Sequence, residues 1–234
     1  MSALASYSDP ILSVLIMAGF AQLVWFSVML FRRGVPASAI QHAAPPILGI
    51  WILLWPVYND SRWLWLAWSA FILITILARF YAHPFWKQLR IAWTARTDDP
   101  TYQNTSNLLP MFHLSLALFV AGFWFQAIPE FGFGLALCLC LAMPAAYWLD
   151  RTEHLKLGFP AHPEQTLAGH IVFIIASALL LCWALHVYHG TPWQPLLIAT
   201  VITAMVGSSI RAISPGEWHL PATMLGMGVT MWLL

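Results

Sequence analysis

The chain alternates between long apolar runs and short polar connections. A membrane-spanning helix needs about 20 consecutive, mostly apolar residues. Eight runs approach that length, at 11–31, 43–58, 63–80, 109–128, 131–149, 167–188, 192–213 and 219–234. The second run is interrupted by prolines and the eighth is short, so we count seven to eight spans. The pattern predicts an all-α, polytopic membrane helical bundle in which residues 1–234 form a single integral membrane domain.

Composition supports the membrane assignment. Hydrophobic residues make up 60% of the chain and charged residues 8%, whereas soluble domains carry about 25% charged residues. Such a chain cannot cover a surface that faces water. Its 14 tryptophans suit the aromatic belts at the two membrane–water interfaces. The formal net charge of +1 indicates no nucleic-acid partner.

Lysine and arginine residues fall almost entirely on one side of this topology. The loops after spans 1, 3 and 5 and the end of span 7 hold nine of the ten, and Arg62 alone lies on the other side. Because cytoplasmic loops carry an excess of Lys and Arg, these loops are predicted to face the cytoplasm and both termini to face outward. We expect an integral protein of a bacterial inner membrane whose functional face is cytoplasmic, where the loops 81–108 and 150–166 lie.

Four histidines stand near the starts of the spans that begin at the predicted cytoplasmic face. They are His42, His113, His170 and His219. Polar side chains at membrane depth are unfavourable and tend to face the bundle interior. One hypothesis is therefore a shared cavity that binds an anion or a metal ion, and the alternative is four separate interfacial histidines. No H-x-x-x-H or H-E-x-x-H spacing supports a metal ion, and we predict no metal ligand.

A haem-binding redox carrier or a transporter is a further alternative. His170 and His186 lie on one predicted helix, 16 residues apart, which is about 24 Å at 1.5 Å per residue. They belong to opposite faces of the membrane, and each would need an axial partner on another helix.

Four segments that contain polar residues follow one another along the chain. A basic stretch and His42 lie in segment 30–66, followed by "NLLPMFHLSLALFVAGFW" (107–124), "EQTLAGHIVFIIASALLL" (164–181) and "AMVGSSIRAISPGEWHLPATML" (204–225). In order and spacing they resemble the phytol kinase and dolichol kinase family. The third segment is similar to that family's Lys-Thr-Val/Leu-Glu-Gly-Ser motif, and the fourth to its run ending in Asp-Asn-Leu-Thr-Val-Pro.

The resemblance implies a polytopic enzyme that transfers a phosphoryl group from CTP or a related nucleotide to a long-chain isoprenoid alcohol, with Mg²⁺, at the cytoplasmic face. The implied catalytic candidates are Asp150, Glu164 and Glu217. The implied substrate- and phosphate-binding candidates are His42, His113, Arg151, Lys156, Thr166, Gly169, His170, Arg211 and His219.

The chain departs from this family at charged motif positions. Gln165 stands where the motif has lysine and Ala168 where it has glutamate, while Thr166 and Gly169 persist. Phosphoryl transfer depends on positioning and on charge stabilisation by cations and metal ions, so the loss of the lysine removes a phosphate clamp. We therefore expect a divergent, non-catalytic relative that binds a lipid, isoprenoid or pigment, or serves as a subunit of a larger membrane complex. An active isoprenoid-alcohol kinase with a rewired site is the alternative.

Overall fold

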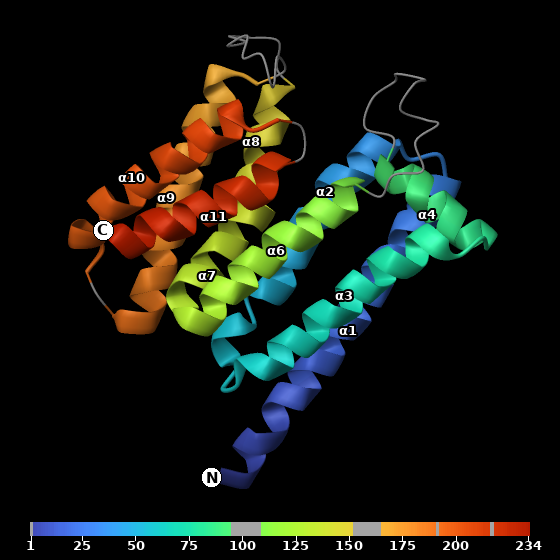
Figure 1. Ribbon diagram of the computed structural model, residues 1–234, viewed down its shortest axis with the longest axis horizontal. Helices are drawn as coiled ribbons and strands as arrows, with labels where there is room; N and C mark the ends of the chain where they lie inside the picture. The colour runs from blue at the N-terminus through green and yellow to red at the C-terminus, as the bar shows by residue number, and fades with distance from the viewer. Residues whose placement is uncertain (1, 95–108, 152–164, 191, 216–217) are drawn as a thin grey trace. The chain divides into compact units, whose positions relative to one another are not determined.

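The computed structural model describes residues 2–94, 109–151, 165–190, 192–215 and 218–234 (Figure 1). Helices make up 89% of the structure, and no β-strand occurs in the described ranges. The predicted all-α class is confirmed for this part of the chain. The residues form two compact units, Met1–Ser115 and Leu116–Leu234, so each is described by itself. That the whole chain forms a single membrane domain stays a prediction.

The first unit is an up-down-up arrangement of long helices with one short helix packed against it. Its elements are α1 (Ser2–Arg32), α2 (Ala37–Ile52), the 3-10 turn η1 (Trp55–Val57), α3 (Ser61–Phe80), α4 (Pro84–Thr94) and the start of α6 (Leu109–Ala127). α2 follows α1 and runs in the opposite direction, so α1 and α3 run parallel to each other. In the core, the Phe20 ring lies 5.5 Å from Trp68 and 4.9 Å from Phe71.

The helix α4 lies inside the segment 81–108, which the hydrophobic pattern predicts to be a loop. Leu89, Ala92 and Trp93 are buried against the longer helices, whereas Lys87 is exposed. An amphipathic helix of 11 residues is too short and too polar to register as a spanning run. The prediction of a loop is therefore wrong for these residues.

The second unit is a set of antiparallel helices. Its elements are the rest of α6, then α7 (Pro129–Leu137), the π-helical segment η2 (Cys138–Ala142), α8 (Met143–Asp150), α9 (Leu167–His189), α10 (Trp193–Ile213) and α11 (His219–Leu233). α9 returns along the rod formed by α7, η2 and α8. Phe133 meets Trp183 with ring centroids 5.6 Å apart, and Cys138 Sγ lies 3.7 Å from the Ser177 carbonyl oxygen. This register brings the end of α8 to the start of α9.

The π-helical segment precedes a proline in the same rod. Pro144 has no N–H to donate to a carbonyl four residues earlier. Just before it, the Met143 N–H bonds to the Cys138 carbonyl, five residues back, which inserts one extra residue into the turn. The extra residue rotates α8 about its axis relative to α7. This rotation determines where the side chains of Tyr147 and Asp150 point.

Within the described ranges, five helical segments are long and apolar enough to cross a membrane. They are Ser8–Arg32, Ala39–Val57, Pro129–Asp150, Leu167–His189 and Trp193–Ile213. Two further apolar helices, Arg62–Ala78 and Phe112–Ala127, are shorter. These lengths support an integral membrane protein, whereas the count of eight spans and the outward position of both termini stay predictions.

One face of α9 shows why the segment suits a membrane. Leu167, Ile171, Ile175 and Leu179 follow one another at a spacing of four residues, and all are exposed. Such residues form a single stripe along a helix. An apolar stripe that faces outward is unfavourable in water and favourable against lipid or a partner helix.

At one end of the first unit, a buried carboxylate anchors the turn before α3. Asp9 in α1 accepts hydrogen bonds from the backbone N–H groups of Asn59 and Asp60, at 3.1 and 2.8 Å, and from the Asn59 side-chain amide at 3.2 Å. Nearby, the Ser13 hydroxyl donates to the Trp63 carbonyl at 2.6 Å. These contacts fix the lengthwise register of α1 against α3.

We expect Asp9→Ala to destabilise the first unit by about 2 kcal/mol, since hydrogen bonds to a charged group contribute about 1.5–3 kcal/mol. The matched control is Ser69→Ala on the exposed side of α3, which should stay within about 0.5 kcal/mol. Thermal or denaturant unfolding of the full chain in detergent measures both. Equal losses for the two variants would contradict the anchoring role.

Candidate functional site

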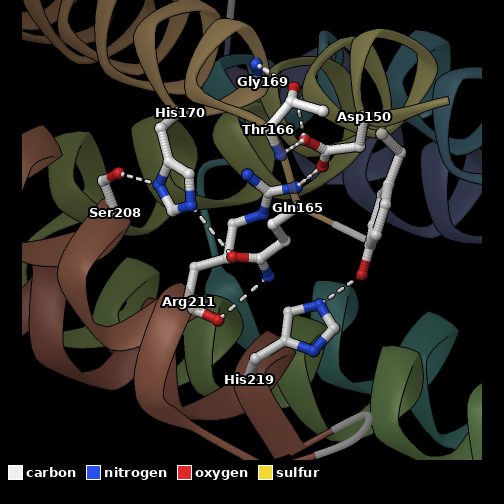
Figure 2. Close-up of polar contacts among 9 residues, drawn as sticks. Asp150, Gln165, Thr166, Gly169, His170, Ser208, Arg211 and His219 are labelled. Atoms are coloured by element: carbon white, nitrogen blue, oxygen red, sulfur yellow. Dashed lines mark hydrogen bonds and ion pairs between the residues drawn. The ribbon is translucent and has the colours of Figure 1, made fainter. Parts of the chain in front are cut away.

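Polar side chains from four helices gather at one end of the second unit (Figure 2). This end combines the last turn of α8, the first turn of α9, the last turn of α10 and the first turn of α11. The residues are Tyr147, Asp150, Gln165, Thr166, His170, Ser208, Arg211 and His219. We call this set the polar cluster. Its members meet because consecutive antiparallel helices end and begin at the same level.

A buried ion pair lies at the centre of the polar cluster. Arg211 Nη2 donates to Asp150 Oδ2, and the exposed fractions of the two residues are 0% and 5%. The other carboxylate oxygen, Oδ1, accepts from the Thr166 backbone N–H at 2.8 Å and from its hydroxyl at 3.1 Å. Arg211 sits in the last turn of α10 and the carboxylate sits at the start of α9, so both helix dipoles favour the charges they meet. Asp150 thus joins α8, α9 and α10.

Thr166 and Gly169 form the start of α9. Thr166 is the N-cap, and its hydroxyl oxygen accepts from the Gly169 N–H at 3.0 Å. A Cβ on Gly169 would overlap Asp150 Oδ1 and lie 2.7 Å from Asp150 Cγ and 3.1 Å from the Ala146 carbonyl oxygen. The absence of a side chain at this position therefore lets the ion pair approach α9.

His170 has a hydrogen-bond partner at each of its two ring nitrogens. The Gln165 amide donates from Nε2 to the Arg211 carbonyl at 3.2 Å, so its Oε1 is the atom that faces His170 Nε2, at 2.9 Å. An amide oxygen only accepts, so His170 Nε2 carries the proton. His170 Nδ1 forms a hydrogen bond with the Ser208 hydroxyl at 2.6 Å.

Aromatic rings flank the guanidinium of Arg211. The Tyr147 and Phe173 ring centroids lie 5.2 and 5.9 Å from its Cζ atom, within the range of cation–π attraction. The Tyr147 hydroxyl also hydrogen-bonds with His219 Nε2. Tyr147 therefore links the ion pair to the first residue of α11.

Some buried polar atoms have no acceptor or donor within the part of the chain that the structure describes. In this unit they include Arg211 Nε, Arg211 Nη1 and the hydroxyl of Thr223. Thr223 is fully buried and lies one turn after His219 on α11. An unsatisfied buried group costs about 1–3 kcal/mol, and more when charged, so proteins rarely keep one without a ligand, a water molecule or a functional reason.

The structure brings together six of the residues that sequence predicted for the site. They are Asp150, Thr166, Gly169, His170, Arg211 and His219. Arg151 follows Asp150 and is exposed. Lys156, Glu164 and Glu217 lie outside the described residues, as does the side chain of His42. His113 is buried in the first unit, and its predicted place in a cavity shared with His170 and His219 stays a prediction.

Sequence reasoning did not include Tyr147, Phe173, Ser208 and Thr223 in the site. A usable signal existed for Ser208, because it stands three residues before Arg211 inside an apolar run. Residues at that spacing share a helix face, and polar residues at membrane depth tend to face the interior. Tyr147 and Phe173 carried no such signal, since aromatic residues are frequent throughout the chain.

Comparisons with protein-family models, curated proteins and solved structures find no match to this chain. The resemblance to the phytol kinase and dolichol kinase family stays a prediction, and function is argued below from the geometry of the polar cluster.

Gly169→Ala should destabilise the second unit by about 1–3 kcal/mol, because the added methyl group displaces Asp150 from a closely packed site. Helix propensity alone would favour alanine by about 1 kcal/mol, so the sign of the change is diagnostic. Leu167→Ala, on the exposed face of the same turn, serves as the control. Unfolding of the full chain in detergent tests this, and stabilisation by Gly169→Ala would contradict the close approach.

Breaking the ion pair from either side should destabilise the second unit more than removing both charges. Asp150→Asn and Arg211→Met are each expected to lose about 3–5 kcal/mol, since each leaves an uncompensated buried charge. The double variant should lose clearly less than the sum of the two. A double-mutant cycle of unfolding free energies measures the coupling, and strict additivity would show that the two groups do not interact.

Proposed function

We propose that this chain is a non-catalytic, prenol-kinase-like membrane protein whose polar cluster holds the head of a lipid or isoprenoid. In this proposal the protein resides in a bacterial inner membrane with the cluster toward the cytoplasm. The observation that carries the proposal is the internal use of the charged groups. Asp150 and Arg211 neutralise each other in a buried pair, and this arrangement suits binding better than phosphoryl transfer.

The roles of Asp150 and Arg211 explain this preference. A general base must reach the proton of the attacking hydroxyl, and cations must contact the transferred phosphoryl group. Asp150 instead accepts from Arg211 and twice from Thr166. Arg211 lies beneath two aromatic rings. Both groups hold helices together in this arrangement.

Gln165 supports the same interpretation. It occupies the position of the motif lysine, is buried, and bridges the His170 ring and the Arg211 carbonyl. An amide in that bridge satisfies one acceptor and one donor without adding charge. The position therefore has a structural role here that a phosphate-clamping lysine would not fill.

The apolar exterior fits a protein that works with lipids or other membrane subunits. Besides the stripe on α9, Ile198, Ile202 and Met205 on α10 are exposed. Their spacing of three to four residues again marks one helix face. This surface is available to a lipid chain, a pigment or a partner helix.

Purified full-length protein should contain a bound lipid and should lack kinase activity. Extraction with organic solvent and mass spectrometry are expected to recover an isoprenoid or other lipid from the wild type, and less of it from Arg211→Met. Ser69→Ala, on the exposed side of α3 in the first unit, is the control for general loss of lipid.

The same preparation, incubated with CTP or ATP, Mg²⁺ and phytol or farnesol, should form no prenyl phosphate. Formation of prenyl phosphate by the wild type that Asp150→Asn abolishes would establish the alternative, an active isoprenoid-alcohol kinase.

A further inference from the structure

The polar cluster has more hydrogen-bond donors than acceptors. A guanidinium carries five N–H donors and no acceptor. Nη2 of Arg211 meets Asp150, whereas Nε and Nη1 meet no acceptor in the described part of the chain. The Asp150 carboxylate, by contrast, already accepts three hydrogen bonds. The missing component is therefore an acceptor.

Thr223 lies at the same level of the bundle as Arg211. α10 and α11 are antiparallel neighbours, and a Cβ on Gly207 would lie 2.5 Å from Met227 Sδ. One turn along α10 leads from Gly207 to Arg211, and one turn back along α11 leads from Met227 to Thr223. The unpartnered hydroxyl of Thr223 and the unpartnered N–H groups of Arg211 are thus adjacent in helical register.

The charge of the polar cluster restricts what the acceptor can be. The Asp150 and Arg211 charges cancel, and the polar cluster as described contains no other Asp, Glu, Lys or Arg side chain. A phosphate placed at Arg211 would add negative charge beside a buried carboxylate, with no second Lys or Arg of the described cluster to balance it. Charge burial of this kind is strongly unfavourable, whereas an uncharged oxygen adds none.

The surplus of donors also separates a carbonyl from an alcohol. A carbonyl oxygen has two lone pairs and no hydrogen, so it fills two donors and adds none. A hydroxyl group has the same two lone pairs but brings a further donor, which would compete with the N–H groups of Arg211 for the oxygen of Thr223. We propose that Arg211 and Thr223 bind the carbonyl oxygen of an uncharged ester or ketone lipid. This proposal rests on the lipid-binding function proposed above and names the chemistry of the head group.

The surroundings of Arg211 suit such a ligand. Tyr147 and Phe173 cover the guanidinium, so an acceptor approaches at its edge, where the N–H groups lie. Met227, which is fully buried against Gly207, has an unbranched and adaptable side chain.

The test compares three probes that share a farnesyl chain and differ in head group. Radiolabelled farnesylacetone, farnesol and farnesyl phosphate are titrated against the full-length protein in lipid nanodiscs. We expect the ketone to bind at least tenfold more tightly than the phosphate and more tightly than the alcohol. Tighter binding of the phosphate or of the alcohol would overturn the carbonyl assignment while leaving lipid binding intact. Failure of all three probes to bind, together with the absence of extractable lipid, would overturn the proposed function as well.

Two variants connect the preference to the named groups. Arg211→Lys retains the charge opposite Asp150 but removes the guanidinium edge, and Thr223→Val retains the side-chain shape but removes the hydroxyl. Each should weaken ketone binding, by about tenfold for Arg211→Lys and about threefold to tenfold for Thr223→Val. Ser209→Ala, on the exposed side of α10, should leave it unchanged. Unchanged affinity in the folded Thr223→Val protein, whose substitution is nearly isosteric, would exclude Thr223 from the site.

Discussion

The ion pair between Asp150 and Arg211 is the constraint on which the second unit depends. Removing two opposite charges from water is unfavourable by several kcal/mol per ion, and the loss is offset only when both ions are close and further hydrogen-bonded. This requirement fixes the end of α8, the start of α9 and the last turn of α10 at one level. Gly169 without a side chain and Thr166 with a hydroxyl are the residues that make the approach sterically and electrostatically possible.

The apolar pattern predicted the long helices well because a helix that spans a membrane is apolar over nearly its whole length. The length of the apolar run therefore gives the length of the helix. The run 167–188 corresponds to α9 at Leu167–His189, and 192–213 to α10 at Trp193–Ile213. The pattern failed where an element does not depend on a long apolar run. α4 is short and amphipathic, and the π-helical turn at Cys138–Ala142 follows from backbone hydrogen bonding around a proline.

Part of the candidate site was predicted because the sequence shows which polar residues stand at the ends of the apolar runs. Asp150, Thr166, His170, Arg211 and His219 all stand at the ends of runs that should terminate at the same face. Which of them touch depends on the rotation of each helix about its own axis, and a one-dimensional pattern does not determine that rotation for neighbouring helices. Nothing in the sequence distinguished Asp150, which pairs with Arg211, from the other loop carboxylates.

Gln165 and the residues around it form a consistent set in the folded unit. A lysine at position 165 would place a second cation beside the buried Arg211, with Asp150 as the single carboxylate that the structure shows there. Glutamine retains length and hydrogen bonding without charge, and its orientation, set by the Arg211 carbonyl, sets the protonated nitrogen of His170. Gln165, His170 and Ser208 therefore form one continuous chain of hydrogen bonds. A cluster whose charges are balanced internally is suited to recognise an uncharged head group, and the orphaned donors of Arg211 mark where that group would lie.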